Sequence, residues 1–336
     1  MPVTTSLRSE IRLQAWLVGL GVLLMGGKLL AWQLTGSHAI LSDAAESLVN
    51  VLAGSFTWYS LVLSARPRDL NHPYGHGKIE FLAAGIEGAL LALAGLLIVA
   101  NAAVGLFEKH ELKSLDWGLA ITAAAGAINF GLGSWARKRA AQTQSLPLEA
   151  GGKHLQADGY TTVGLLIGLS LVWLTDWYWL DAVVALVFGL FLCYTAWGIL
   201  QPSLAGIMDE ADEQMLTRIA DVLEQNRQAD WVDCHNMRMI RYGRMLHVDA
   251  HLTLPRYYSV EQAHEAMDRI DKLVTAEFGR QMEFFIHVDP CLPTGCSICA
   301  KEDCPVRSTA FAGSLAWELP LLMQNKKHQP ISPVGS

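Results

Sequence analysis

Long apolar runs follow one another through the first 200 residues of the chain, separated by short polar stretches. They cover residues 13–35, 39–65, 81–107, 115–136, 154–175 and 178–200. Each is close to the roughly 20 residues that a helix needs to cross a bilayer. Because backbone groups inside lipid must be hydrogen-bonded within their own segment, the pattern predicts an α-helical bundle of six transmembrane helices, with both termini on one side.

The pattern changes after residue 201. An amphipathic helix is predicted at 212–226, two strands at 235–242 and 245–254 around a short turn, a second helix at 260–278 and a third strand at 282–288. Alternation in the second strand places apolar residues on one face and His247, Asp249 and His251 on the other. This αββαβ order with antiparallel strands predicts a small two-layer α+β domain, ferredoxin-like or metallochaperone-like.

Composition and charge agree with a chain in two parts. Hydrophobic residues make up 51% of the chain and charged residues only 17%, whereas soluble domains carry about 25% charged residues. Residues 1–200 hold 12 Lys and Arg against 13 Asp and Glu, and residues 201–336 hold 13 against 19. These values exclude a single soluble domain and a disordered chain. They also exclude a nucleic-acid binder, because there is no basic stripe to hold phosphates.

The distribution of basic residues predicts the orientation. They are frequent in the N-terminal arm, the second-to-third loop and the fourth-to-fifth loop, and the opposite loops are poor in them. The positive-inside rule therefore places both termini and the acidic C-terminal half in the cytoplasm of a multi-pass protein, which we expect in a bacterial inner membrane. The basic residues on the cytoplasmic side are Arg8, Arg12, Arg66, Arg68, Lys78, Arg137, Lys138, Arg139 and Lys153.

Three regions follow from these patterns. Residues 1–201 form the six-helix membrane domain, residues 202–290 the cytoplasmic αββαβ domain, and residues 291–336 a Cys-rich tail that we expect to be flexible. The first apolar run is too long for a signal peptide and has no convincing small-residue cleavage site, so it is counted as a helix.

Ionisable residues inside two predicted spans are the first candidate site. Glu46 and Asn50, and likewise His154 and Asp158, are four residues apart, so each pair lies on one helical face. If the two faces meet, two carboxylates, an imidazole and an amide oxygen form a tetrahedral site that suits a divalent ion such as Zn²⁺. The alternative is a hydrogen-bonded cluster that only joins two helices. For Asp43, one turn before Glu46, a capping or structural role is at least as well supported.

Two further His-rich clusters lie outside the spans. In the loop before the third span, Asp69, His72 and His76 have a spacing that could fold around a metal, although a loop histidine is often only solvated. The cytoplasmic domain concentrates five histidines and an aspartate within about 55 residues, which favours a second metal-rich surface over scattered surface histidines. These residues are His235, His247, His251, His264, His287 and Asp289.

The cysteines are a separate signal. Cys193 lies in the sixth span and is interpreted as a small core residue, and Cys234 is either a bystander or an extra soft ligand beside His235. The last four follow a C-x₄-C-x₂-C-x₄-C spacing in a compartment where disulfides are disfavoured, which favours thiolate binding of Zn²⁺ or an iron–sulfur cluster. Inert or reactive thiols are the alternative. The four are Cys291, Cys296, Cys299 and Cys304.

Several short motifs together resemble one family from about residue 12 to residue 290. They are SDA at 42–44, the Glu46 and Asn50 pair, NHPYGHGK at 71–78, HLQAD at 154–158 and IHVDP at 286–290. With six spans and the αββαβ domain, the chain resembles the cation diffusion facilitator family of divalent-metal/proton antiporters. The resemblance implies efflux of a divalent transition metal in exchange for protons, by alternating access, in a homodimer in membrane lipid.

The resemblance also assigns roles to residues. It implies a transport site midway across the membrane, a loop site, and a cytoplasmic binuclear site near a dimer interface that is braced by a salt bridge from Lys78 to Asp209; for Lys78, ordinary positive-inside topology is an equal alternative. The implied transport ligands are Glu46, Asn50, His154 and Asp158, and the loop ligands Asp69, His72 and His76. The implied cytoplasmic ligands are His235, His251, His264, His287 and Asp289, with His247 the weaker candidate.

One departure from the family pattern concerns the second span. The family commonly has Asp or His followed by Asp, where this chain has Glu46 and Asn50. The amide removes one negative charge and one proton acceptor, but Glu46 and Asp158 still supply two charges for one divalent ion. His154 favours Zn²⁺, Fe²⁺, Co²⁺ or Ni²⁺ over Mn²⁺ or Mg²⁺; Zn²⁺ is the first expectation, and Cd²⁺ is also a candidate.

Two rival functions remain at the level of sequence. A passive cation channel would have polar pore-lining residues and no coupling to protons. A membrane-anchored metal or redox sensor would use the C-terminal cysteines and need the bundle only as an anchor. The chain is not expected to be an enzyme, because it has no nucleophile–base set and no phosphate-binding glycine loop.

Overall fold

The computed structural model describes the backbone of residues 3–35, 38–105, 117–175, 177, 179–279 and 281–329. Within these ranges the side chains at 3–6, 31, 32, 34, 35, 38–46, 105, 117–122, 165, 168–170, 172, 173 and 181 are outside the described set. The chain divides into two compact units, Met1–Met208 and Asp209–Ser336.

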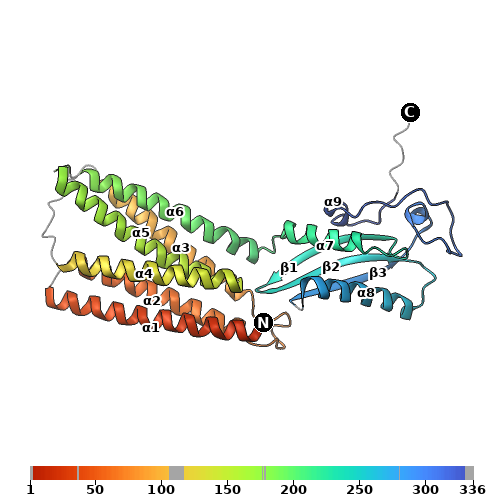
Figure 1. The fold of residues 1–336 in the computed structure, drawn as a ribbon, viewed down its shortest axis with the longest axis horizontal. Helices are drawn as coiled ribbons and strands as arrows, with labels where there is room; N and C mark the ends of the chain where they lie inside the picture. Colours follow the sequence, from red (N-terminus) through yellow and green to blue (C-terminus); the bar gives the residue numbers. More distant parts are fainter. Residues whose placement is uncertain are drawn as a thin grey trace. The chain divides into compact units, whose positions relative to one another are not determined.

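Six long helices make up the first unit, one for each predicted apolar run (Figure 1). Several helices start before or end after the predicted apolar run, because polar residues add helical turns at the ends. In the fifth helix, for example, a Glu149 to Lys153 ion pair of 2.9 Å lies before the apolar stretch. The helices are α1 (Val3–Thr35), α2 (His38–Ser64), α3 (Ile79–Gly105), α4 (Trp117–Thr143), α5 (Leu146–Thr175) and α6 (Trp179–Ile207).

Four of these helices contain segments that are long and apolar enough to cross a membrane, within the part of the chain that the structure describes. They are Leu7–Leu30, Ser47–Ser64, Ile79–Val104 and Ala182–Ile207, in α1, α2, α3 and α6. Six spans were expected. Helices α4 and α5 have similar length but carry more polar side chains, including Arg137 and Asp158, so length and composition alone do not establish them as spans.

The helices pack in pairs, with α1 beside α2, α3 beside α6 and α4 beside α5 (Figure 1). Glycines allow two of these pairs to approach closely. A Cβ at Gly95 of α3 would lie 2.9 Å from the carbonyl oxygen of Gly189 in α6, and one at Gly133 of α4 would lie 2.6 Å from that of Gly152 in α5. Small residues at such positions are typical of helix packing inside membranes.

The second unit has the predicted αββαβ order: α7 (Glu213–Gln225), β1 (Asp233–Tyr242), β2 (Met245–Leu254), α8 (Val260–Phe278) and β3 (Met282–Pro290). The Asp212 side chain caps α7, and Ser259 and Gln262 form a capping box at the start of α8. Apolar side chains of both helices pack against one face of the sheet, and the core includes Val248 and Leu252 of β2. The opposite face is left for polar residues.

The prediction of antiparallel strands is wrong for one of the two pairings. The sheet order is β1-β2-β3, and β1 pairs antiparallel with β2, but β2 pairs parallel with β3. The reason is the connection: a two-residue turn reverses the chain between β1 and β2, whereas α8 crosses the sheet face and returns the chain to the end where β2 began.

The described residues after β3 belong to the tail that we expected to be flexible, and they are folded. This segment holds a 3₁₀ helix, η1 (Pro293–Ile298), and a short helix, α9 (Leu319–Leu322), and it packs on the core. Trp317 and Leu322 are buried. The Arg227 guanidinium lies 4.3 Å from the centre of the Trp317 ring and donates to the Leu315 carbonyl at 2.6 Å. Only a few irregularly spaced residues hold the segment against the core. Hydrophobic periodicity therefore did not predict that the segment packs there.

Candidate metal sites

An amide, an imidazole and a carboxylate meet between α2 and α5. The Asn50 Oδ1 atom lies 2.9 Å from His154 Nε2, and the Asn50 amide nitrogen donates to Asp158 Oδ2 at 2.7 Å. The other oxygen of Asp158 is 3.9 Å from the same His154 nitrogen. The structure therefore brings together three of the four residues expected in the membrane, with Asn50 joining the other two; this arrangement is the membrane cluster.

The fourth expected residue, Glu46, lies outside the described side chains, as does Asp43. Their backbone positions belong to α2, and Glu46 is four residues before Asn50. That spacing puts Glu46 on the same face of α2 as Asn50. Its participation therefore remains a prediction from the spacing.

A buried carboxylate that the sequence reading missed completes the membrane cluster from a third helix. Glu87 of α3 is buried, and its Oε2 lies 3.0 Å from His154 Nδ1. The Thr57 hydroxyl donates to the other oxygen of Glu87 at 3.1 Å. Glu87 has no second polar residue one turn away in α3, so a search for pairs did not find it. A single glutamate inside an apolar span was itself the available signal.

A cavity leads to the membrane cluster, with about 680 Å³ of empty space that is partly open. Its lining includes Asn50, Glu87 and His154, together with residues of α1 such as Lys28. Lys28 is buried and donates to the Ser47 hydroxyl at 2.7 Å. The sequence analysis did not predict a role for this lysine either, because it treated residues 13–35 as an apolar run.

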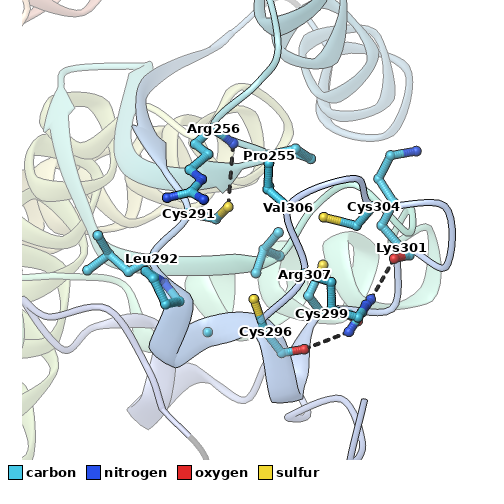
Figure 2. Close-up of a pocket in the computed structure, with 13 residues that line it drawn as sticks. Pro255, Arg256, Cys291, Leu292, Cys296, Cys299, Lys301, Cys304, Val306 and Arg307 are labelled. Atoms are coloured by element: carbon cyan, nitrogen blue, oxygen red, sulfur yellow. Dashed lines mark hydrogen bonds between the residues drawn. The ribbon is translucent and has the colours of Figure 1, made fainter. Parts of the chain in front are cut away.

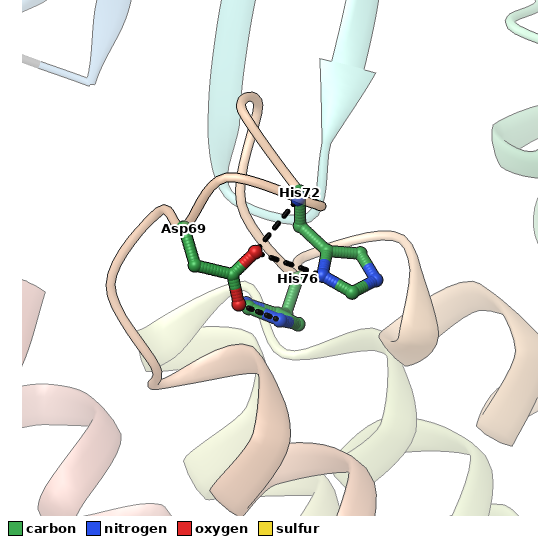
Figure 3. A group of neighbouring side chains, drawn as sticks. All are labelled: Asp69, His72 and His76. Carbon is green, nitrogen blue, oxygen red and sulfur yellow. Dashed lines mark hydrogen bonds and ion pairs between the residues drawn. The ribbon is translucent and has the colours of Figure 1, made fainter.

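The loop between α2 and α3 holds the second expected group, shown in Figure 3. Asp69 Oδ1 is 3.1 Å from His72 Nδ1, and Asp69 Oδ2 is 3.3 Å from His76 Nε2. The loop is closed by backbone bonds between Asp69 and His72 and by Gly75, whose φ of 88° favours glycine. One ligand atom from each of the three residues lies within 4.8 Å of the others, so the group could hold one metal ion.

The local hydrogen bonds keep the loop carboxylate charged. Desolvation acts to raise the pKa of Asp69, but hydrogen bonds from the His72 backbone and ring and from the Asn71 backbone outweigh it. The pKa of Asp69 is therefore below its usual value. A carboxylate that is already deprotonated at neutral pH is ready to bind a cation.

Strand register builds the third group. His251 of β2 is directly opposite His235 of β1 on one side and His287 of β3 on the other. In the next row, Thr253 is opposite Asp233 and Asp289. Because opposite residues on paired strands share a face, three histidines and two aspartates lie on the polar side of the sheet.

The distances select the core of this group. His235 Nε2 and His251 Nδ1 lie 3.4 and 3.1 Å from Asp289 Oδ2, and these three residues form the second described set with ligand atoms within 4.8 Å of one another. They are the cytoplasmic cluster. Side-chain exposure rises across the sheet, from 5% at His235 to 29% at His251 and 64% at His287. His287 contacts the His251 ring at 4.6 Å between centroids, so it lies at the open edge.

A second group of polar residues lies behind the cytoplasmic cluster and orients its side chains. The sequence analysis did not predict this group. Asp233 Oδ2 is 3.2 Å from His235 Nδ1, and Asp233 Oδ1 is 2.6 Å from the Nδ1 of buried His328. The Lys327 ammonium lies 3.6 Å from Asp289. His328 is 93 residues from His235 along the chain, in the segment expected to be flexible, so its role was not visible in the pattern.

Two expected cytoplasmic residues are not brought into the cluster. His264 lies on α8, whose buried residues pack on the apolar side of the sheet, and its side chain is 68% exposed with Asp268 3.8 Å away. His247, the weaker candidate, shares the sheet face with His251 but is held by Asp249 at 3.0 Å and Glu283 at 3.5 Å. Within one chain, His264 therefore has no place beside His235 and His251.

The expected salt bridge between Lys78 and Asp209 would join the two units. Lys78 belongs to the first unit and Asp209 to the second. The pairing therefore remains a prediction from the resemblance.

The six cysteines are all free; Cys193 is partly buried in α6, and the other five fall into two kinds. Cys234 packs in the core of the second unit, where burial raises the pKa of its thiol to about 12, which favours the bystander reading over a soft ligand. Cys291, Cys296, Cys299 and Cys304 line one cavity after β3. Hydrogen bonds from Ser308 lower the pKa of the Cys296 thiol, whereas burial raises the pKa of Cys299.

Comparison with known families agrees with both units. Residues 15–208 match the family model of the cation efflux transmembrane domain, and residues 211–291 match that of the cation efflux protein cytoplasmic domain. The four-cysteine segment extends past the second match.

Individual relatives cover most of the chain. An uncharacterised transporter of Synechocystis sp. is 31% identical over 260 residues, which are 76% of this chain and 83% of the relative. The cation-efflux pump FieF of Shewanella oneidensis is 26% identical over 78% of this chain and 88% of its own length, and the FieF of Escherichia coli O127:H6 is 28% identical over 79% and 87%. The resemblance seen in the sequence is confirmed: the chain belongs to the cation diffusion facilitator family and is a cation-efflux transporter of the membrane, not an enzyme.

Proposed function

We propose that the chain exports a divalent transition-metal ion in exchange for protons, with Zn²⁺ as the first candidate and Fe²⁺, Co²⁺, Ni²⁺ and Cd²⁺ as others. The observation that carries the proposal is the contact of Asn50 with both His154 and Asp158 between α2 and α5. An imidazole nitrogen, an amide oxygen and a carboxylate on one side of a cavity are a ligand set that suits such an ion.

Each residue of the membrane cluster has a distinct role in this proposal. The metal ion replaces the short hydrogen bonds among His154 Nε2, Asn50 Oδ1 and Asp158, and Glu46 supplies the fourth ligand. Glu87 accepts the Nδ1 proton of His154, because its Oε2 lies 3.0 Å from that nitrogen. This contact keeps a proton on Nδ1, so that the Nε2 lone pair faces Asn50 and Asp158 once the ion has displaced the Nε2 proton that is donated to Asn50 Oδ1. A carboxylate behind a metal-binding imidazole fixes the ring and strengthens the ligand.

Proton coupling follows from competition for the same lone pairs. Ligands must be deprotonated to bind a metal, so arrival of the ion from the cytoplasm displaces a proton from His154 or from a neighbouring carboxylate. The loaded bundle then opens to the other side, where protons displace the metal. This cycle requires α4 and α5 to cross the membrane as well, which gives six crossings and places both termini in the cytoplasm.

The two remaining groups act on the cytoplasmic side. In this proposal Asp69, His72 and His76 bind an ion near the entrance, and His235, His251 and Asp289 bind one in the cytoplasmic unit, with His287 at the open edge. The match to the cation efflux cytoplasmic domain supports a homodimer. His264 is 68% exposed, so it is available to complete the cytoplasmic cluster of a second copy. The Lys78 to Asp209 salt bridge would then brace the dimer.

The test is metal-driven proton flux in proteoliposomes that contain the full chain. Asp158→Ala is expected to abolish both metal uptake and the opposing proton flux. Glu149→Ala is the matched control, since Glu149 lies on the same helix but pairs with Lys153. Undiminished flux in Asp158→Ala would remove this site from the mechanism, and metal flux without proton movement in the unmodified protein would favour a passive channel.

A further inference from the structure

Four cysteines surround one small space immediately after β3. Cys291 follows the last residue of the strand, Cys296 lies in η1, Cys299 directly follows η1, and Cys304 comes from the next turn. Figure 2 shows their sulfur atoms turned toward a common space instead of away from one another. The space has about 420 Å³ of empty volume and is partly open to solvent.

The surroundings of two of the four sulfur atoms, those of Cys291 and Cys296, suit thiolates. The Arg256 backbone N–H points at Cys291 Sγ at 3.4 Å, and the Ser308 hydroxyl and backbone N–H point at Cys296 Sγ at 3.3 and 3.5 Å. Donors directed at sulfur stabilise its negative charge. Four thiolates around a divalent ion carry a net charge of −2, and the lining of the cavity includes the basic residues Arg256, Lys301 and Arg307.

The loop that carries the cysteines is held in shape independently of them. The Arg307 guanidinium donates to the backbone carbonyls of Cys296, Cys299 and Lys301, and Figure 2 shows two of these bonds. Burial of Ile298 fixes η1 from the other side. A preformed loop lowers the entropy cost of placing the four side chains, as is required of a binding site.

We propose that Cys291, Cys296, Cys299 and Cys304 ligate a metal centre that is separate from the transport machinery. All four are free, and no disulfide competes for them among the described cysteines. The ligand class is soft: tetrathiolate sites take a single Zn²⁺ or an iron–sulfur cluster. Cys291 is the last residue that matches the cation efflux cytoplasmic domain, and Cys296, Cys299 and Cys304 lie beyond the match, so the matched domains do not account for the set of four.

The distances between the sulfur atoms help to decide whether the site binds a single Zn²⁺ or an iron–sulfur cluster. A tetrahedral Zn²⁺ with Zn–S bonds of about 2.3 Å needs sulfur atoms about 3.8 Å apart. The four cysteines are not among the described groups whose ligand atoms all lie within 4.8 Å of one another. A single ion therefore requires the sulfurs to close in, whereas a cluster of several irons fits a wider ring. Elemental analysis distinguishes the two.

The centre would connect the end of β3 to the segment that supports the cytoplasmic cluster. Cys291 is two residues after Asp289, and the backbone N–H of Cys291 donates to the Leu254 carbonyl of β2. The same C-terminal segment continues to Trp317 in the core and to His328 behind His235. Loss of the metal is therefore expected to lower the thermal stability of the cytoplasmic unit.

The experiment compares the metal content of the full chain, purified without oxygen in detergent, with that of a variant in which all four cysteines are serine. The unmodified protein is expected to carry one metal centre per chain more than this variant; zinc without sulfide identifies a single ion, and iron with acid-labile sulfide identifies a cluster. Cys193→Ser is the matched control, because Cys193 lies in α6 against Gly95, and it should keep the full content. Cys304→Ser, with its oligomeric state checked by size exclusion, replaces the fourfold variant if that does not fold.

A second readout does not depend on any variant. Co²⁺ added to the metal-free protein is expected to give intense sulfur-to-cobalt charge-transfer absorption, which His and Asp sites do not produce. Equal metal content in the unmodified protein and the cysteine variants, absence of that absorption, or a disulfide between two of the four residues in the anaerobic protein would each overturn the proposal. None of these readouts requires transport, so the result is independent of the antiport mechanism.

Discussion

The membrane cluster and the cytoplasmic cluster use the same kinds of side chain but are built differently. In the membrane unit, Asn50, His154 and Asp158 come from two helices and contact one another directly, and Glu87 supports them from a third. In the cytoplasmic unit the register of three strands places the histidines in a row. Helix packing thus surrounds one site and leaves it open only to a cavity, whereas the sheet leaves the other open along an edge.

Within the proposed function, this difference suits the two clusters to different tasks. Buried polar groups must be satisfied, so the membrane cluster pairs its own members when no ion is bound, and an entering ion has to replace those contacts. Such an exchange suits a site that fills and empties in every cycle. The cytoplasmic cluster instead has its buried end fixed by Asp233 and its other end exposed at His287. That asymmetry suits a site completed by a second copy and kept filled, which biases a conformational equilibrium.

After the loss of Asp158 itself, removal of the supporting carboxylate should have the largest effect. Glu87→Gln keeps the shape of the side chain but removes the charge that faces His154 Nδ1 at 3.0 Å. Loss of an acid behind a metal-binding imidazole typically costs about 10–100-fold in affinity or activity. We expect a decrease of that size in the transport rate at low metal concentration, measured in proteoliposomes. Glu149→Gln on the surface of α5 makes the same charge change and should transport normally; an equal loss in both variants would rule out a specific role for Glu87.

Conversion of the amide of the membrane cluster to an acid should change selectivity. Asn50→Asp adds a third carboxylate beside Asp158 in place of the 2.7 Å hydrogen bond. An added negative charge worth about 1.4 kcal/mol gives about tenfold tighter binding, with the largest gain for ions that prefer oxygen ligands, such as Mn²⁺. Transport rates for Zn²⁺, Fe²⁺, Co²⁺, Ni²⁺, Cd²⁺ and Mn²⁺ in both proteins measure this. An unchanged order of the six ions would show that Asn50 does not contact the ion.

The sequence predicted the candidate ligands of both clusters better than the residues that hold those ligands in place. Four-residue spacing identified Asn50, His154 and Asp158, because on a helix that spacing alone decides which residues share a face. Alternation along β2 identified His251 with similar success, and helix 260–278 was predicted at its observed bounds, since a capping box marks its start. Local periodicity therefore carries enough information for residues that act within one element.

The residues that hold the ligands in place are brought there by contacts between distant parts of the chain, and no local sequence pattern predicts such contacts. Glu87 faces His154 only because α3 packs near α5, and His328 reaches Asp233 from a segment without periodicity. The parallel pairing of β2 with β3 likewise follows from the path of α8 across the sheet. His264 is a case in which the residue type misled the prediction. A histidine suits a metal site, but within one chain α8 places this histidine away from His235 and His251.

Opening the cytoplasmic cluster should reduce transport less than Glu87→Gln in the membrane unit. His251→Ala removes the histidine at the centre of the row, between His235 and His287. We expect loss of metal from the cytoplasmic unit and a transport rate about fivefold lower, at the low end of typical couplings between sites. His247→Ala provides the contrast on the same strand, because Asp249 and Glu283 hold that histidine outside the cluster. Complete loss of transport in His251→Ala would mean that the two clusters do not have separate tasks.

The smallest effect is expected from His328→Ala, because His328 reaches His235, a proposed ligand of the cytoplasmic cluster, only through Asp233. His328 Nδ1 lies 2.6 Å from Asp233, and Asp233 in turn lies 3.2 Å from the Nδ1 of His235. Without His328, Asp233 keeps its contact with His235 but loses a partner that fixes its orientation. Because direct loss of such an orienting acid costs about 10–100-fold, a change one step further out should weaken metal binding by less than about tenfold.

The measurement is a calorimetric metal titration of the full chain, with transport followed in parallel. Lys326→Ala is the matched control, since Lys326 lies two residues away in the same segment and is exposed. A threefold change in cytoplasmic affinity with an unchanged transport rate would separate the two clusters most clearly. If His328→Ala instead abolishes transport while the protein stays folded, the C-terminal segment is part of the transport cycle, and the distinction between a site that cycles and one that stays filled must be abandoned.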